Sequence, residues 1–281
     1  MMFIVILVAL IIERFFDWSH LRQWGWFVIA QQKLLTKIPV KSPYLALILS
    51  IMPLLLVILL LQFLLLGVLY GFVQLIFQLI ILLYCLGPRN FWADAFACIH
   101  ALTQGDAQYA AEKLKACFGI HDIHSSQTLH QQFISHIFRA SNHRVFAVIF
   151  WYVVLGPVGA VLYRTISLTA LEAPKENALF AELSQRAQFI TAILDWIPMH
   201  IFTFIFALSG HFAQVLACWR AKKSFNLANS EAMLTECGIS ALGYQENQLP
   251  EDGSTETAVM SLLDRSFIIA LVLVALVTLL V

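Results

Sequence analysis

The stretch ILDWIPMHIFTFIFALSGHFAQVLACW, from Ile193 to Trp219, decides the fold class of this chain. After Asp195 it contains no Lys, Arg, Asp or Glu until Arg220. At about 1.5 Å per residue, a helix of this length crosses a hydrocarbon core of about 30 Å. The sequence therefore predicts a transmembrane helix here, with Asp195 as its N-cap and Pro198 in its first turn.

The predicted helix carries a polar stripe, because eleven residues make almost three helical turns. The residues that fall on one face are His200, Thr203, Ala207, His211 and Gln214. Polar side chains are costly in hydrocarbon, so the stripe should face protein or a wet cavity. It is either a buried ligand or proton pathway, or a set of hydrogen bonds between helices. Helix association alone would produce it, and we prefer this second interpretation.

Composition gives the same class for the whole chain. Its 281 residues are 60% hydrophobic and only 12% charged, with a mean hydropathy of +0.80. Soluble domains carry about 25% charged residues. We expect an all-α, multi-pass helical membrane protein with about five membrane segments, whose main partner is the lipid bilayer.

Charge and cysteine usage exclude several other classes. The 17 basic and 17 acidic residues cancel, so nothing indicates nucleic acid as a partner. The cysteines form no CxxC pair and their count is odd, which predicts free and mostly buried thiols. They are Cys85, Cys98, Cys117, Cys218 and Cys237.

Apolar runs and charge clusters divide the chain into six parts. They are an apolar and interfacial segment (1–42), a transmembrane helical hairpin (43–87), a cytoplasmic helical region (88–144), a second transmembrane hairpin (145–219), a cytoplasmic loop (220–264) and a C-terminal anchor (265–281). The second hairpin contains a connector, 165–192, that is much less basic than the other loops. The positive-inside rule places this connector in the periplasm.

Local features add four expectations. Glu13 and Arg14 either lie at the interface, which we prefer, or enter the bundle and neutralise each other. Three helices are expected between 89 and 144, and their histidines 121, 124 and 130 are expected to be solvated loop residues, not metal ligands. Gly156, Pro157 and Gly159 should kink the second hairpin or admit a close backbone. Broken helices at membrane depth often mark binding sites.

Three stretches resemble the AmpE family, inner-membrane proteins associated with β-lactamase induction in Gram-negative bacteria. They are ILVALIIERFF (6–16), FWYVVLGPVGAVLYR (150–164) and LDWIPMHIFTFIFALSGHF (194–212). AmpE is in turn similar to the CobD/CbiB enzymes of cobalamin biosynthesis, which use ATP to attach an aminopropanol phosphate arm to a corrinoid. The resemblance therefore brings two classes into competition, a regulatory protein and an amide-forming membrane ligase.

The resemblance to the ligases implies a comparison of individual positions. Where they carry Glu, Asn, Asp, a pair of Asp, Asn and Arg, this chain has Ser141, Ser167, Ala170, Thr191 with Ala192, Asp195 and His200. Magnesium bound with ATP needs carboxylate oxygens, and most of these candidates are absent. The positions that match the shared pattern are Asn142, Tyr163, Arg164 and Pro198.

We therefore expect a catalytically inactive signalling or accessory protein of β-lactamase induction and the cell-wall stress response, located in the inner membrane. No cofactor, metal or catalytic residue is expected. Partners would be other components of β-lactamase induction and muropeptide recycling. The alternatives are a CobD/CbiB-like ligase or a membrane protein that binds a small ligand. The expected polar membrane site comprises Asn142, Tyr163, Arg164, Asp195, His200 and His211, with Arg164 and Asp195 as a pair.

Overall fold

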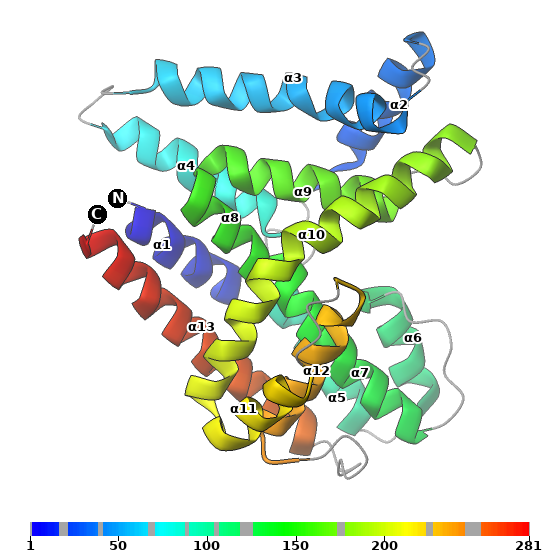
Figure 1. Cartoon of the computed structure of the whole chain (residues 1–281), viewed down its shortest axis with the longest axis vertical. Helices are drawn as coiled ribbons and strands as arrows, with labels where there is room; N and C mark the ends of the chain where they lie inside the picture. The colour runs from blue at the N-terminus through cyan, green and yellow to red at the C-terminus, as the bar shows by residue number, and fades with distance from the viewer. Residues whose placement is uncertain are drawn as a thin grey trace. The chain divides into compact units, whose positions relative to one another are not determined.

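The computed structural model describes residues 2–16, 22–38, 42–66, 71–87, 90–103, 107–118, 126–172, 178–222, 227–244 and 254–280. All regular secondary structure in these ranges is helical (Figure 1), which confirms the all-α prediction. The α-helices are α1 (Met2–Phe15), α2 (Gly25–Lys37), α3 (Pro43–Leu64), α4 (Phe72–Cys85), α5 (Phe91–Thr103), α6 (Ala107–Phe118), α7 (Ser126–Ser141), α8 (Ala147–Leu155), α9 (Pro157–Glu172), α10 (Ala178–Ser209), α11 (Phe212–Ala221), α12 (Ser230–Ala241) and α13 (Ser254–Leu280). A π-helical segment, η3 (Asn142–Phe146), and a short 3₁₀ turn, η4 (Leu227–Asn229), complete them.

The chain forms two compact units, each built from two separate parts of the sequence. Unit 1 comprises Met1–Arg89 and Ala147–Asp195, and unit 2 comprises Asn90–Phe146 and Trp196–Val281. The six parts expected from the sequence follow one another along the chain, and their boundaries stay a prediction. Inside each unit, elements distant in sequence pack together.

Three of the described helices are long and apolar enough to cross a membrane: α3, α10 over Leu179–Ser209, and α13. The helix α4 is apolar but shorter. Many large apolar side chains of α3 are exposed, including Leu45, Leu60 and Phe63. A helix that is apolar on all sides and unburied in protein suits a lipid environment. The chain is a helical membrane protein.

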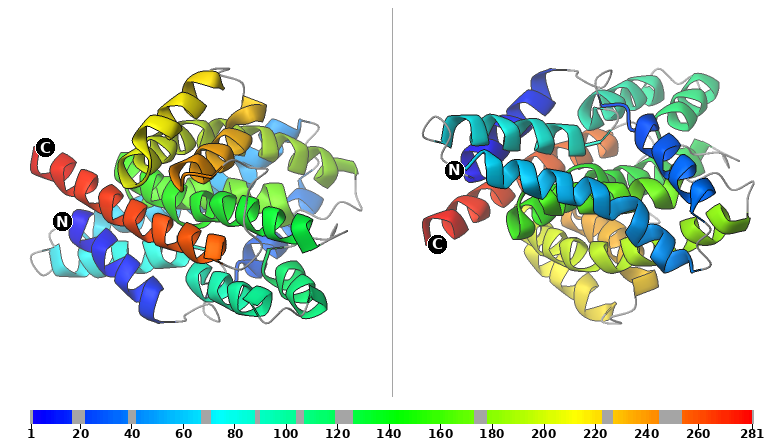
Figure 2. Two further views of the ribbon diagram at one scale, coloured as in Figure 1. Left: turned by 90° about the horizontal axis from the view of Figure 1, so that it is seen from below. Right: turned by 90° about the horizontal axis from the view of Figure 1, so that it is seen from above.

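In unit 1, α4 packs against α1, α8 and α9, and α3 packs against α2 and α9 (Figure 2). Polar side chains join three of these helices. The amide of Gln31, in α2, donates to the hydroxyl of Ser50 at 3.0 Å and to that of Thr169 at 3.2 Å. All three side chains are buried. The Gln31 amide is therefore hydrogen-bonded inside the protein, which the hydrocarbon of a bilayer could not provide.

We expected Glu13 to lie at the membrane interface, but it is fully buried in unit 1. Its carboxylate lies 2.6 Å from the guanidinium of Arg22, which is also buried. A carboxylate is costly to bury without an opposite charge, and Arg22, nine residues later in the chain, supplies one. The preferred interpretation was wrong because it weighed only the neighbouring residues in sequence.

The expected kink in the second hairpin is confirmed. Gly156 has a φ of +67° and separates α8 from α9. A side chain at Gly159 would lie 2.2 Å from the carbonyl oxygen of Trp151, so only glycine admits this close backbone. The helix α9 then continues through most of the first half of the expected connector 165–192, which is largely helical.

The helix α10 is longer than expected and starts earlier. Asp195 lies in its interior, so the predicted N-cap role is wrong, and Pro198 also lies inside the helix. Proline has no N–H to bond the carbonyl of Leu194, four residues earlier. The indole N–H of Trp151 donates to that carbonyl at 3.1 Å and replaces the missing bond.

The predicted single span to Trp219 is also wrong, because α10 ends at Ser209 and α11 begins at Phe212. His211 and Gln214 therefore lie beyond a break in the helix and do not continue the stripe of His200 and Thr203. At the break the amide of His211 donates to the carbonyl of Ala241 at 2.9 Å. This satisfies a carbonyl at the end of α12 that has no partner within its own helix.

Unit 2 contains α5, α6 and α7 in the places expected between 89 and 144. His121 and His124 lie outside the described residues. His130 was expected to be solvated, but it is buried in α7, with its ring against the carboxylate of Glu256. The expected loop 220–264 contains α12 and the start of α13, and the expected anchor begins at Ser254 instead of 265.

Aromatic packing forms the core of unit 2. The rings of Phe146 and Phe202 stack with centroids 4.4 Å apart, and Phe206 lies edge-on to Phe138 at 5.3 Å. Phe267 of α13 packs on Phe202 at 5.6 Å. Because these rings come from η3, α7, α10 and α13, burying them holds together segments far apart in sequence.

Candidate functional site

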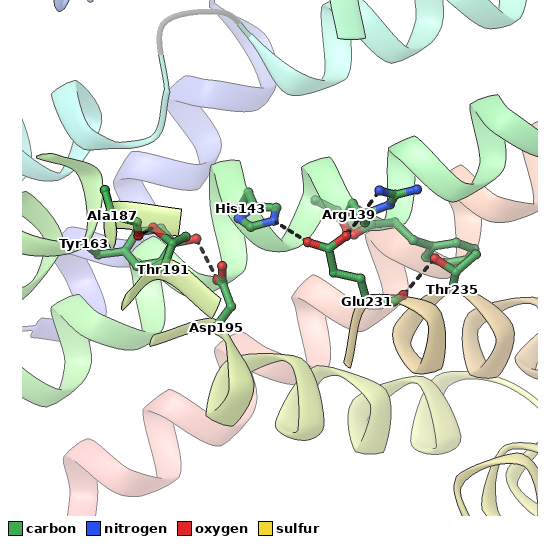
Figure 3. Close-up of polar contacts among 10 residues, drawn as sticks. Arg139, His143, Tyr163, Ala187, Thr191, Asp195, Glu231 and Thr235 are labelled. Carbon is green, nitrogen blue, oxygen red and sulfur yellow. Dashed lines mark hydrogen bonds and ion pairs between the residues drawn. The ribbon is translucent and has the colours of Figure 1, made fainter. Parts of the chain in front are cut away.

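The polar site of unit 1 centres on Asp195, which is 2% exposed. The hydroxyl of Tyr163, in α9, donates to Asp195 Oδ1 at 2.7 Å (Figure 3). Tyr163 is also buried. A charge-assisted bond of this length is among the stronger ones available to a buried carboxylate. The structure therefore brings together two of the predicted site residues, from α9 and α10.

Arg164 serves a different partner from Tyr163, because consecutive residues of a helix point about 100° apart. Its Nε donates to the carbonyl of Cys85 at 2.6 Å, at the end of α4. Trp24 donates from its indole to the adjacent carbonyl of Tyr84 at 3.2 Å, and Arg22 donates to that of Gly87 at 3.4 Å.

Arg164 and Trp24 share one physical task at the end of α4, while Arg22 bonds a carbonyl two residues beyond this helix. The last carbonyls of a helix have no partner within it, and in hydrocarbon they cannot turn to water. The guanidinium charges of Arg22 and Arg164 also face the negative end of the α4 dipole. Arg164 thus caps α4. Whether it also pairs with Asp195 stays a prediction.

The positions where the ligases carry acidic residues hold small side chains that bond to their own helices. Thr191 donates to the carbonyl of Ala187 at 2.9 Å, one turn before Asp195 (Figure 3). Ser141 donates to the carbonyl of Phe138 at 2.7 Å. At Ala170, in α9, the backbone carbonyl accepts a hydrogen bond from Ser184 of α10 at 2.8 Å. In these helices the hydroxyls saturate backbone carbonyls and offer no carboxylate to a ligand.

The predicted site residue Asn142 is fully buried and opens the π-helical segment η3 in unit 2. A π-helical turn accommodates an extra residue in a helix and often occurs at functional sites. The next two residues reach different partners. His143 lies 3.8 Å from the carboxylate of Glu231, and Arg144 donates to Asp94 at 2.9 Å.

Glu231, in α12, is the centre of a second charged group (Figure 3). Arg139 donates to Glu231 Oε2 at 3.2 Å. The contact with His143, together with the charge of Arg139, lowers the pKa of Glu231 below its usual value. Burial, with a smaller contribution from Arg139, lowers the pKa of the neighbouring His136 from 6.5 to about 4.

The two remaining predicted site residues lie in unit 2 and do not form a common cluster there. The ring of His200 bonds back to the carbonyl of Trp196 at 2.7 Å, one turn earlier in α10. His211 is exposed, and its ring lies against Gly243. The bond of His200 is local to its own helix, and a role of His200 and His211 in a membrane site stays a prediction.

Sequence reasoning missed Trp151 and Arg22, which donate to backbone carbonyls, and Glu231, which accepts a bond from Arg139. Trp151 and Arg22 act on backbone carbonyls, which leave no signal in a sequence. Glu231 lies in a segment that we interpreted as a loop. The signal that could have found it is the apolar run around it, whose Met233, Leu234 and Ile239 are buried. Among the described residues, no three His, Cys, Asp or Glu side chains gather in a way that could hold a metal ion.

Comparison with known proteins gives relatives of two kinds. The cobalamin biosynthesis protein CobD of Stutzerimonas stutzeri (strain A1501) is 26% identical over 168 residues, 59% of this chain and 55% of that protein. The protein of the same name from Chromobacterium violaceum is 25% identical over 171 residues, 60% of this chain and 55% of that protein. The alignments thus span about half the length of these relatives. No solved structure matches significantly.

The other relative is a family. The sequence model of the family described as "Regulatory signalling modulator protein AmpE" matches residues 1–281 of this chain. The match includes both parts of each unit, and with them Tyr163, Arg164 and Asp195. The expected resemblance is confirmed, and the chain belongs to the AmpE family.

Proposed function

We propose that this protein is a multi-pass signalling or accessory component of the bacterial inner membrane that acts in β-lactamase induction and the cell-wall stress response. The observation that carries the proposal is the family match over the whole chain. We further propose that it is not a ligase. Its partners would be other components of β-lactamase induction and muropeptide recycling.

The site chemistry supports a role without catalysis. The hydroxyls of Ser141 and Thr191 donate to backbone carbonyls of their own helices, and Ala170 has no polar side-chain atom. Binding of Mg²⁺ with ATP would need carboxylate oxygens at such positions. The carboxylate that does lie nearby, Asp195, already accepts the Tyr163 hydroxyl. A retained fold without these groups suits binding or signalling.

The test of the regulatory role is genetic, in a host with an inducible chromosomal β-lactamase. Deletion of the gene should change the β-lactamase activity that follows exposure to a β-lactam inducer, and the intact gene should restore it. A matched pair of variants sharpens the test. Asp195→Ala should fail to restore the response, whereas Glu182→Ala, an exposed acidic residue on the same helix α10, should restore it. An unchanged induction curve after deletion would overturn the proposal.

The second candidate function is a corrinoid ligase, which the two CobD relatives favour. A strain that lacks its own arm-attaching ligase tests it directly. We expect no cobalamin-dependent growth when this gene is supplied in place of the missing enzyme. An authentic ligase gene is the positive control, and immunodetection in the membrane fraction verifies expression. Growth with this gene would instead establish an enzyme.

A further inference from the structure

Two cysteines of unit 2 lie against each other. Cys218 belongs to α11 and Cys237 to α12, and these helices pack side by side (Figure 1). The Cys237 thiol donates a hydrogen bond to Cys218 Sγ, with 2.7 Å between the sulfur atoms. Both are free thiols. A disulfide needs an S–S distance of about 2.05 Å, so a small side-chain movement would join them.

The two thiols differ in exposure and in their neighbours. Cys218 is half-buried and Cys237 is fully buried. Lys222, one turn after Cys218, forms an ion pair with Glu236, the residue before Cys237. This pair links α11 to α12 beside the sulfur atoms and places an ammonium close to Cys218.

The surroundings shift the pKa values of the two thiols in opposite directions. Hydrogen bonds from Cys237 and Ser240, together with the Lys222 charge, outweigh burial and Glu236 and lower the pKa of Cys218 to about 7. The hydrogen bond to Cys218 and burial raise the pKa of Cys237. Near neutral pH, Cys218 supplies thiolate while Cys237 keeps its proton. Thiolate is the form that reacts with oxidants.

We propose that Cys218 and Cys237 form a peroxide-sensitive pair, in which Cys218 is oxidised first and Cys237 then closes a disulfide between α11 and α12. In the first step the Cys218 thiolate attacks hydrogen peroxide, the O–O bond breaks, and sulfenic acid and hydroxide form. In the second step the Cys237 sulfur attacks the Cys218 sulfur, and hydroxide leaves and takes up the thiol proton as water. Overall, two thiols lose two electrons and peroxide becomes two waters.

Geometry separates this role from ordinary packing of buried cysteines. A buried thiol with an apolar environment is inert and behaves as a small hydrophobic side chain. The pair instead combines a half-buried cysteine, a cation at the C-cap of the same helix and a second thiol in contact. If 220–264 faces the cytoplasm, the disulfide would be transient and would be reduced by cellular thiols, as redox-sensing disulfides are.

The experiment uses the full-length protein in detergent at pH 7, treated with hydrogen peroxide, quenched with catalase and alkylated. Mass spectrometry of the digest should show a peptide cross-link between Cys218 and Cys237 that dithiothreitol reverses. Alkylation should be lost at this pair about tenfold faster than at Cys98, which is buried in α5. Cys98→Ser is the matched control and should leave the cross-link unchanged.

Single substitutions test the order of events. In Cys237→Ser, sulfenic acid should accumulate at Cys218 and be trapped by dimedone. In Cys218→Ser, Cys237 should remain alkylatable after the same exposure. Thermal melting of each variant checks that the fold is kept, and Ser240→Ala, which removes a hydrogen bond to Cys218, should slow oxidation without preventing the cross-link. Equal rates at Cys218 and Cys98, or a dimedone adduct on Cys218 in the unsubstituted protein without a disulfide, would overturn the proposal.

Discussion

At the residue scale, the buried carboxylate of Asp195 depends on the hydroxyl of Tyr163. Tyr163→Phe removes the donor and leaves a buried acceptor short of one bond, which costs about 1–3 kcal/mol of unfolding free energy. We expect a lower melting temperature for this variant in detergent. Tyr44→Phe is the control, because it makes the same change at an exposed tyrosine of unit 1 and should leave melting unchanged. An unchanged Tyr163→Phe would show that the bond does not stabilise the fold.

Arg164 offers a second test at the same scale, because it caps α4 and was also expected to pair with Asp195. Removing either partner of a buried charge pair leaves the other unpaired, which costs more than removing both. Arg164→Ala and Asp195→Ala should each lower the melting temperature. The decrease in the double variant should be smaller than the sum of the two single decreases. Additive losses in this cycle would mean that Arg164 acts on α4 alone.

His136 provides a prediction on pH. Its pKa falls from 6.5 to about 4 in the folded protein, mainly through burial. Between pH 6.5 and about 4, His136 is therefore protonated in the unfolded chain and neutral in the folded chain. The free energy of unfolding falls as the pH falls through this range. Above 6.5 both states are neutral at this group and its effect vanishes.

We expect His136→Gln to lose less melting temperature between pH 7 and pH 5 than the unsubstituted protein, in scans in the same detergent. His100→Gln is the matched control, since His100 is exposed on α5. The idea fails if the two variants show the same dependence on pH.

At the element scale, the joint between α10 and α11 depends on Gly210. A methyl group there would lie 2.3 Å from the carbonyl oxygen of Ala241, which backbone atoms cannot easily vacate. Gly210→Ala should therefore cost about 1–3 kcal/mol, the usual range for overpacking. Gly25→Ala, where nothing lies within 4 Å, should melt like the unsubstituted protein. Equal melting temperatures of the two variants would show that the backbone at Gly210 accommodates a methyl group without loss of stability.

Helix positions were predictable where composition changes sharply along the chain. The charge-free run gave α3 and α4, and Gly156 marked the break between α8 and α9. The start of α10 was not predictable, because Asp195 and Pro198 together are typical of a helix N-terminus. A tryptophan far away in sequence replaces the bond that proline removes, and only the fold brings it there.

At the scale of the whole molecule, membrane class could be predicted from hydropathy, but the two units could not. Each unit joins segments separated by dozens of residues, and the pairs that join them carry no local signal. Gln31 with Thr169 and His143 with Glu231 are examples. The candidate site was predictable in part, because Tyr163 and Asp195 were both named from the sequence, whereas the hydrogen bond between them is known only from the fold.

The orientation of the chain in the membrane is the last prediction. The connector 165–192 carries two basic and three acidic residues, and the segments 13–41 and 89–144 are more basic, so the positive-inside rule places this connector in the periplasm. In a background without the native cysteines, Glu182→Cys should react with an impermeant maleimide on intact cells. Lys115→Cys, on α6, should react only after the membrane is opened. Both original residues are exposed, so access within the protein is comparable. Labelling of Lys115→Cys from outside, with protection of Glu182→Cys, would show that the chain has the opposite orientation.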